Sequence, residues 1–369
     1  MHASSKTDER YWAYYDGLQH AKHSILRRYL DGWLPILSSC SGRVLYIDCH
    51  AGRGRHETGH EGSPVLALQR LLEHRLRNRI LASTEVHFIF FEIDPDNYVA
   101  LKSEIIALGS LPKQIYVDVY CEDYESALRE AFEDLKRRGQ VLAPAFAFVD
   151  PYGFSLSMDL LNNLLSFRQC ELLVNFMYRY VDMAIHRDVQ ASNMDSLFGC
   201  PEWRSLTTIN DPNERAEAAI HLFSSQLKAE FVTHMYMRGV NRRLKYVLLH
   251  ATNHKRGREL MKEAMWSIEP SGSFSAYERT NPDQFVLISA EPELRPLKDR
   301  LWSEFVGREV RMDVIYDWLA GELYCKKHLH QVLRDYRRQK ILEFSGYVDR
   351  FAFSKNPTVH FPAERPRGA

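Results

Sequence analysis

The chain has 369 residues, enough for one large domain or two of ordinary size. Its 45% hydrophobic and 26% charged residues are typical of a globular protein. Lysine plus arginine equals aspartate plus glutamate at 48 each, so only local clusters of charge can indicate a polyanionic partner.

The six cysteines include no C-x-x-C pair, which argues against a disulfide framework or zinc site and favours reduced thiols. No apolar run approaches the about 20 residues that span a membrane. The N-terminal residues are polar, unlike a signal peptide. We therefore expect a cytoplasmic protein without membrane spans.

Hydrophobic periodicity predicts a first helix over residues 11–38, followed by strands that alternate with helices. The strands are expected at 43–49, 86–92, 115–120, 145–149 and 171–178, and the helices at 63–76, 96–108, 124–139 and 157–167. This repetition predicts an α/β fold in which a parallel, Rossmann-like sheet carries helices on both faces.

The regular alternation of strands and helices ends after the fifth strand. Residues 181–240 have helical patterns and predict a helical insertion or lid. Two late edge strands are expected at 245–253 and 285–290, around a helix at 256–268. We place this α/β domain at residues 1–300.

Residues 301–369 form the second predicted domain. Three helical patterns precede a strand pair at 347–354 and 358–361, an order that suggests a winged helix. Segment 326–340 carries a net charge of +5 within a neutral protein. Its candidates for nucleic-acid contact are Lys326, Lys327, Arg334, Arg337 and Arg338. A recognition-type helix would place them against phosphates, whereas protein contact or a solvated basic face is the alternative.

The stretch LYIDCHAGRG at 45–54 is the most informative part of the chain. A hydrophobic run ends in Asp48 and continues into a turn with Gly52 and Gly54, which allow positive φ and close approach of a ligand. A tight strand-to-helix turn is the alternative. The dinucleotide motif would need a third glycine where Glu57 stands, so another nucleotide-like cofactor is favoured.

Two more strand ends carry carboxylates beside this loop. Glu92 ends the second strand, where it can accept hydrogen bonds from ribose hydroxyls. Asp94 competes for that role, but the following Pro95 indicates a helix entry. Asp123 follows the third strand and could reach an adenine amino group, or it is a solvated loop acid.

The fourth strand ends in Asp150-Pro151-Tyr152-Gly153. A carboxylate and a backbone carbonyl can orient an amine toward an electrophile, and an aromatic ring can stack on a planar substrate. An aspartate-proline turn with a core tyrosine is the alternative.

Three further polar residues are candidates. Lys22 and His23 lie on the first helix, over the cofactor's carboxylate or on a solvated face, and Asn175 ends the fifth strand on the substrate side. The histidines show no H-E-x-x-H spacing, so we predict no metal site.

Several motifs together resemble a class I S-adenosylmethionine-dependent methyltransferase, and more narrowly the three-Cys-motif partner (TcmP) family. They are KHSILRRYLDGW, DCHAGRGR followed by GSPVLAL, FIFFEIDP, VDPYG, LLVNF and ATNHKRGRELMKEAMW. The resemblance implies S-adenosylmethionine in the cleft and a radical-type iron–sulfur partner protein bearing three cysteines. His50 replaces the aromatic residue of the usual D-x-F-A-G-x-G form and lies at the cofactor edge, and Tyr152 follows one proline instead of two.

The leading hypothesis is methyl transfer to an exocyclic nitrogen of a nucleic-acid base. In it, Gly52 and Gly54 admit the methionine end of the cofactor and Asp48 lies near its amino group. Asp150 and the Pro151 carbonyl orient the substrate amine. The alternatives are a non-catalytic cofactor-binding partner of the radical protein, or a methyltransferase of a small molecule or peptide.

Overall fold

The computed structural model describes residues 12–153, 155–278, 291–347 and 349–366. The chain divides into two compact units, one of residues 1–268 with 274–285 and the other of 269–273 with 286–369.

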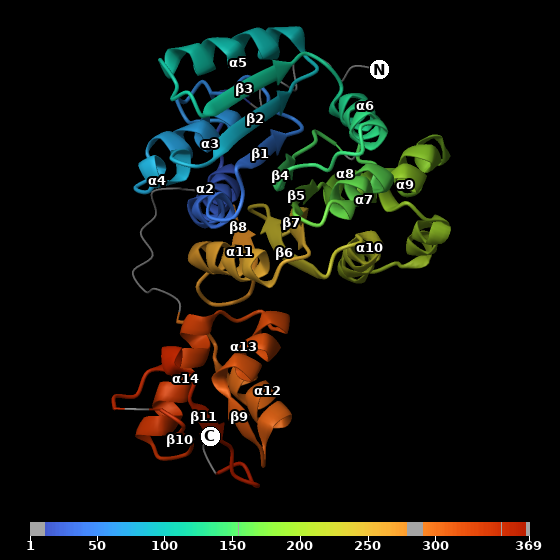
Figure 1. Cartoon of the computed structure of the whole chain (residues 1–369). Coiled ribbons are helices and arrows are strands. Elements are labelled where there is room, and N and C mark those ends of the chain that lie inside the picture. The colour runs from blue at the N-terminus through green and yellow to red at the C-terminus, as the bar shows by residue number, and fades with distance from the viewer. Residues whose placement is uncertain (1–11, 154, 279–290, 348, 367–369) are drawn as a thin grey trace. The chain divides into compact units, whose positions relative to one another are not determined.

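An eight-stranded sheet with the order β3-β2-β1-β4-β5-β7-β6-β8 forms the centre of the first unit (Figure 1). The strands are β1 Arg43–Asp48, β2 Glu85–Phe91, β3 Ile115–Tyr120, β4 Ala145–Val149, β5 Cys170–Phe176, β6 Phe231–Arg238, β7 Leu244–Thr252 and β8 Ser275–Tyr277. Strands β1 to β5 are parallel, and β7 is antiparallel to both β5 and β6. The order reverses between β1 and β4, which is where such sheets bind ligands beyond their carboxyl ends.

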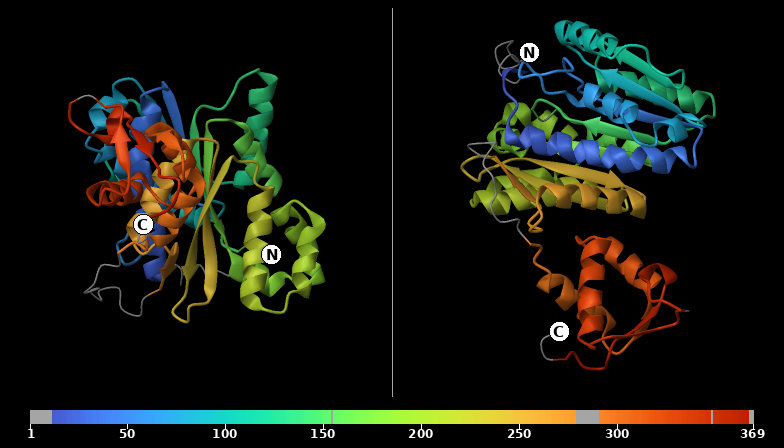
Figure 2. Two further views of the ribbon diagram at one scale, coloured as in Figure 1. Left: turned by 90° about the horizontal axis from the view of Figure 1, so that it is seen from below. Right: turned by 90° about the vertical axis from the view of Figure 1, so that its left-hand side faces the viewer.

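Helices cover both faces of this sheet, as Figure 2 shows. They are α2 Gly17–Ser38, α3 Ser63–Leu72, α4 Arg77–Leu81, α5 Pro95–Ala107, α6 Tyr124–Arg137, α7 Met158–Ser166, α8 Tyr178–Ala184, α9 Ala191–Phe198, α10 Pro212–Gln226 and α11 Lys255–Ile268. On one face, Tyr29 and Trp33 of α2 pack on Phe146 of β4. The opposite face of β4 joins a core shared with α7 to α10. The predicted Rossmann-like α/β fold is therefore present.

The helix predicted over 11–38 is interrupted: residues 12 and 13 are helical, 14–16 are not, and α2 begins at Gly17. Asp16 caps the amino end of α2: its carboxylate accepts from the Gln19 amide at 2.7 Å, and the Gln19 side chain accepts from the Asp16 amide at 3.2 Å.

The predicted helical insertion at 181–240 is wrong at its end. Residues Phe231–Arg238 form strand β6, whose buried positions alternate along Thr233, Met235 and Met237. This period of two is the signal that the helical prediction missed. The short edge strand β8 was also missed, and the strand predicted at 285–290 lies outside the described residues.

The second unit packs three helices against a three-stranded antiparallel sheet with the order β10-β11-β9. The elements are α12 Arg295–Phe305, β9 Glu309–Arg311, α13 Met312–Gly321, α14 Lys326–Arg338, β10 Glu343–Ser345 and β11 Thr358–His360. Its own core includes Leu297, Ile315, Leu329 and Val359. The strand predicted at 347–354 is wrong: β10 comes before it, and the described part of that range is loop with a 3-10 turn.

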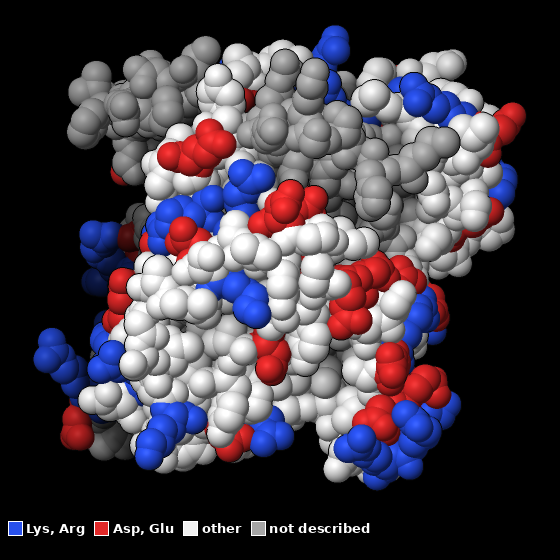
Figure 3. All heavy atoms as spheres, turned by 90° about the horizontal axis from the view of Figure 1, so that it is seen from above, with Lys and Arg blue, Asp and Glu red and all other residues white. Residues whose placement is uncertain are grey.

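Charged side chains of both signs are interspersed over the face drawn in Figure 3. No helix in the described ranges combines the length and hydrophobicity needed to cross a bilayer. Those same ranges contain no group of three or more histidine, cysteine, aspartate or glutamate side chains placed to hold a metal ion.

Candidate active site

The site is built around Asp48, the last residue of β1, which is fully buried. Its carboxylate accepts from the Tyr46 hydroxyl and the His50 amide, both at 3.3 Å, and from the Ser63 hydroxyl. It forms no ion pair with any described residue. Burial, with a smaller effect from the charge of Asp150, raises the pKa of Asp48 to about 7. A ligand that brought a positive charge here would stabilise the ionised form.

The loop after β1 is held by Glu92 at the end of β2. One carboxylate oxygen of Glu92 accepts from the Gly52 amide at 2.7 Å, and the other accepts from the Asp94 amide at 2.7 Å. Asp94 instead accepts from the first amides of α5. The structure therefore separates the two acids as the sequence suggested, with Glu92 at the loop and Asp94 as a helix cap.

The two glycines of the loop have different surroundings. Gly52 has φ +64°, and a Cβ there would lie 2.3 Å from the indole of Trp12. Gly54 has φ +85°, and a Cβ there would meet Leu101 of α5 at 3.0 Å. Gly54 thus allows the loop to pack on its neighbouring helices, whereas Gly52 lies under an aromatic cover.

Lys22, Asp150 and Asn175 meet at the ends of α2, β4 and β5. The ammonium of Lys22, which is 3% exposed, pairs with one carboxylate oxygen of Asp150. The other accepts from the Asn175 amide nitrogen at 2.6 Å. Because that nitrogen faces a carboxylate, the amide oxygen of Asn175 points elsewhere, and it is buried without a hydrogen-bond partner among the described residues. This places Lys22 against Asp150, where the sequence had suggested a cofactor carboxylate or a solvated face.

His23, the neighbour of Lys22, is buried, and the Tyr15 hydroxyl lies 3.0 Å from its Nδ1 atom. Burial holds the pKa of His23 well below its usual range, so the ring is neutral.

Pro151 is buried and Tyr152 is half exposed beside it. The Tyr152 ring lies 5.9 Å from that of Tyr180 on α8, an aromatic pair that the sequence did not suggest. Burial and a hydrogen bond to Tyr152 raise the pKa of Tyr180 to about 12, so the Tyr180 hydroxyl stays protonated at neutral pH. The exposed ring is available to stack on a planar ligand.

Asp123 is exposed and caps α6 by accepting from the Ser126 amide and hydroxyl, both at 2.9 Å. Asp123 is therefore an exposed helix cap, which fits the solvated loop acid that the sequence offered as the alternative. Its carboxylate oxygens retain lone pairs for further hydrogen bonds.

The rings of His50 and Tyr124 pack against each other at the other side of the loop, tilted by 57° with centroids 4.7 Å apart. The His50 Nδ1 atom and the Tyr124 hydroxyl are buried without hydrogen-bond partners in the described structure. Burial lowers the pKa of His50 to about 4 and raises that of Tyr124, so both are neutral at pH 7. Two buried polar atoms without partners are typical of a site that a polar ligand completes.

Sequence reasoning missed the aromatic segment before α2. Trp12 covers Gly52, its carbonyl accepts from the Glu57 amide at 2.9 Å, and Tyr15 stacks on His60 at 4.2 Å. The density of aromatic residues in YWAYYD was the available signal.

The basic candidates of the second unit lie on α14. Lys327, Arg334, Arg337 and Arg338 are exposed, while the ammonium of Lys326 lies 5.0 Å from the Tyr316 ring.

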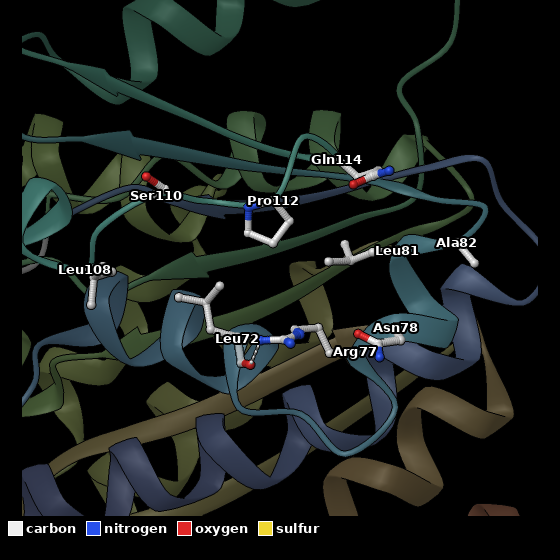
Figure 4. Close-up of a pocket in the computed structure, with 9 residues that line it drawn as sticks. All are labelled: Leu72, Arg77, Asn78, Leu81, Ala82, Leu108, Ser110, Pro112 and Gln114. Carbon is white, nitrogen blue, oxygen red and sulfur yellow. Dashed lines mark hydrogen bonds between the residues drawn. The ribbon is translucent and has the colours of Figure 1, made fainter.

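A separate hollow occurs near the amino ends of β2 and β3 (Figure 4). It is lined by Leu72, Arg77, Asn78, Leu81, Ala82, Leu108, Ser110, Pro112 and Gln114. None of the candidate residues lies there, and it is at the opposite edge of the sheet from Asp48 and Asp150.

No family model and no curated protein matches this chain. Among solved structures, protein LPL1258 from Legionella pneumophila is 13% identical with a TM-score of 0.36 over 62% of this chain and 84% of its own. Trm1 from Pyrococcus horikoshii in complex with S-adenosyl-L-methionine is 11% identical with a TM-score of 0.34, over 97% and 93%. The S-adenosylhomocysteine-bound methyltransferase PaMTH1 from Podospora anserina is 11% identical with a TM-score of 0.28, over 69% and 98%. At these scores the fold assignment depends on the strand order of the sheet itself.

Proposed function

We propose that the first unit is an S-adenosylmethionine-dependent methyltransferase whose acceptor is an exocyclic nitrogen of a nucleic-acid base. The observation that carries the proposal is the group of Asp48, Asp150, Lys22 and Asn175 at the point where the strand order reverses. Among the described residues, the Asp48 carboxylate pairs with no cation and the Asn175 amide oxygen accepts no hydrogen bond.

The cofactor site is formed by the two strand ends beside the loop. Asp48 would hold the cationic amino group, and the Glu92 carboxylate, which binds the Gly52 and Asp94 amides, would accept from the ribose hydroxyls. The His50 Nδ1 atom and the Tyr124 hydroxyl, which have no hydrogen-bond partner among the described residues, suit the adenine end, where Asp123 was expected. When bound, S-adenosylmethionine supplies an electrophilic methyl group; the protein supplies orientation.

The acceptor site is formed by the ends of β4 and β5. Asp150 and the Asn175 oxygen can accept the two N–H bonds of a primary amine, and this directs its lone pair toward the cofactor cleft. Lys22 pairs with Asp150 and holds its carboxylate in position. Asp150 can also hold the proton that the amine gives up. Tyr152 would stack on the base that carries the amine.

The second unit would bind the phosphates of the nucleic-acid substrate. Its three helices and antiparallel sheet support a winged-helix interpretation, with Lys326, Lys327, Arg334, Arg337 and Arg338 of α14 as the contacts. Binding through these residues would weaken as salt rises.

A second candidate function is cofactor binding without transfer, in which the chain serves a radical-type iron–sulfur partner. The Lys22–Asp150 ion pair favours it, because a carboxylate that already holds a buried ammonium has less capacity to accept from a substrate. Methylation of a small molecule or peptide is the third possibility and would need no nucleic acid.

Calorimetric titration with S-adenosylmethionine tests the cofactor site. Wild-type protein should bind, and Asp48→Ala and Glu92→Ala should each lose binding. No binding by the wild type would remove the proposal and would also count against cofactor binding without transfer by the isolated chain.

Labelled methyl transfer to bulk DNA or RNA then tests the chemistry. Asp150→Ala should abolish turnover while cofactor affinity stays within about a few-fold, because the residue faces the acceptor. Asp159→Ala is the matched control, since Asp159 is an exposed carboxylate that pairs with Arg129. Binding without any transfer would favour the second candidate.

A further inference from the structure

The positive charge of the second unit is concentrated on one helix. From residue 286 onward the sequence has fifteen lysine and arginine residues and twelve acidic ones. Segment 326–340 contains six of the fifteen but only one of the twelve. The rest of the unit is therefore slightly acidic, and α14 forms a local basic surface.

One face of α14 presents a continuous polar stripe. Lys327, Gln331, Arg334 and Arg338 are exposed and follow one another at intervals of four, three and four residues, which places them on the same side of the helix. Together with Asp335 they line a shallow hollow. The opposite side anchors the helix through the buried residues Leu329, Val332, Leu333 and Tyr336.

The charges of the stripe are mostly uncompensated. Among the described residues, neither Lys327 nor Arg334 pairs with a carboxylate, whereas Arg338 pairs with Asp335. A solvated helix face usually carries acids that balance its bases at neighbouring turns, and this face has a single one.

The segment between β10 and β11 is packed against the same helix. The Arg337 guanidinium lies 3.9 Å from the centre of the Phe351 ring, and His330 stacks on Phe353 at 4.3 Å. Burial lowers the pKa of His330 to about 4, so this contact is that of a neutral ring. The segment carries the exposed Arg350, which places a further cation on a loop fixed to the helix.

We propose that α14 enters the major groove of double-stranded DNA, with Gln331 and Arg334 at base edges and Lys327 and Arg338 at phosphates. The inference deepens the proposed function, since it names duplex DNA as the substrate class.

The dimensions and side-chain types of the stripe support this assignment. It is about 16 Å long at the rise of an α-helix, and a B-form major groove is about 12 Å wide and admits a helix. Glutamine and arginine, which occupy its centre, can make paired hydrogen bonds to adenine and guanine edges. The deep, narrow major groove of duplex RNA does not admit a helix, so the geometry favours DNA.

Fluorescence anisotropy with the full chain, without cofactor, tests the proposal. The probes are a mixed-sequence DNA duplex of about 20 base pairs, the RNA duplex of the same sequence, and each single DNA strand. The DNA duplex should bind at least about tenfold more tightly than the RNA duplex or the single strands. Equal affinities, or no binding to the DNA duplex, would overturn the proposal; binding of α14 to an acidic protein alone would point to protein docking.

Four variants assign the roles on the helix. Lys327→Ala and Arg338→Ala should each lower the salt slope of log K by about one, without changing sequence preference. Gln331→Ala and Arg334→Ala should reduce the preference between different DNA duplexes about fivefold or more. Identical effects of all four variants on every sequence would overturn the division into base and phosphate contacts.

Two further variants separate binding from damage to the fold. Asp335→Asn removes the acid from the hollow and releases Arg338, so it should tighten DNA binding a few-fold, which a merely destabilised helix would not do. Arg137→Ala with Arg138→Ala removes two exposed charges at the end of α6 and should leave DNA affinity unchanged. Weaker binding by Asp335→Asn, or a loss in the α6 variant equal to that of the stripe variants, would contradict the role of α14.

The same experiments distinguish this inference from the proposed function. DNA binding that depends on α14, in a chain that fails to bind S-adenosylmethionine, would leave the inference standing and remove the proposed function. Methyl transfer in a chain whose α14 variants bind DNA normally would do the reverse.

Discussion

Replacement of Asp48 by asparagine should stabilise the protein and at the same time destroy its cofactor site. Burial raises the pKa of Asp48 from 3.8 to about 7. Each pKa unit corresponds to about 1.4 kcal/mol, so the ionised side chain costs the fold up to about 4 kcal/mol.

The direction of the Asp48 pKa shift determines how its contribution to the free energy of unfolding depends on pH. Because the folded-state pKa is raised, the native state holds its proton more tightly than the unfolded chain does. The cost is absent below about pH 4, grows as pH rises toward 7 and is constant above that. Asp48→Asn should therefore raise the free energy of unfolding by about 4 kcal/mol or less at pH 8 and by about 1.5 kcal/mol or less at pH 5.

Urea denaturation at the two pH values, followed by a signal from the first unit, measures the difference. Asp159→Asn serves as the control, because that carboxylate is 69% exposed. Calorimetry on the same sample should show that Asp48→Asn no longer binds S-adenosylmethionine. A variant that is destabilised equally at both pH values would show that Asp48 is an ionised structural group, and the reasoning would be refuted.

Three other substitutions have expected outcomes. Gly52→Ala should abolish cofactor binding, because its Cβ would lie 2.3 Å from the Trp12 indole and displace this cover. Gly59 also has a positive φ, but a Cβ there meets open space, so Gly59→Ala should cost only about 1 kcal/mol of stability in thermal melts. Lys22→Met should destabilise the fold by about 3 kcal/mol or more in urea, and the double variant with Asp150→Asn should recover part of that loss; additive losses would show that the pair is not coupled. Tyr152→Ala should raise the KM for a nucleic-acid acceptor about tenfold while Tyr152→Phe stays near wild type, and an unchanged KM in both would exclude stacking.

The sequence by itself determined the alternation of strands and helices from β1 to β5 and the edge of the sheet at which a ligand would bind. Hydrophobic runs that end in Asp48, Glu92 and Asp150 are local patterns, and parallel strands bring their carboxyl ends to one edge whatever the details of packing. The concentration of charge on α14 was equally visible, because it lies within a single helix. Alternation along β6 was present in the sequence too, but a preceding helical pattern obscured it.

Only the tertiary structure decided which side chains meet. Lys22 and Asp150 are 128 residues apart, and their ion pair depends on how α2 lies across β4. The cover of Trp12 over Gly52 and the partnerless amide oxygen of Asn175 likewise follow from packing between distant segments. Periodicity records which face of an element is buried, whereas the partner on that face is fixed by the order of the strands and the path of the helices between them.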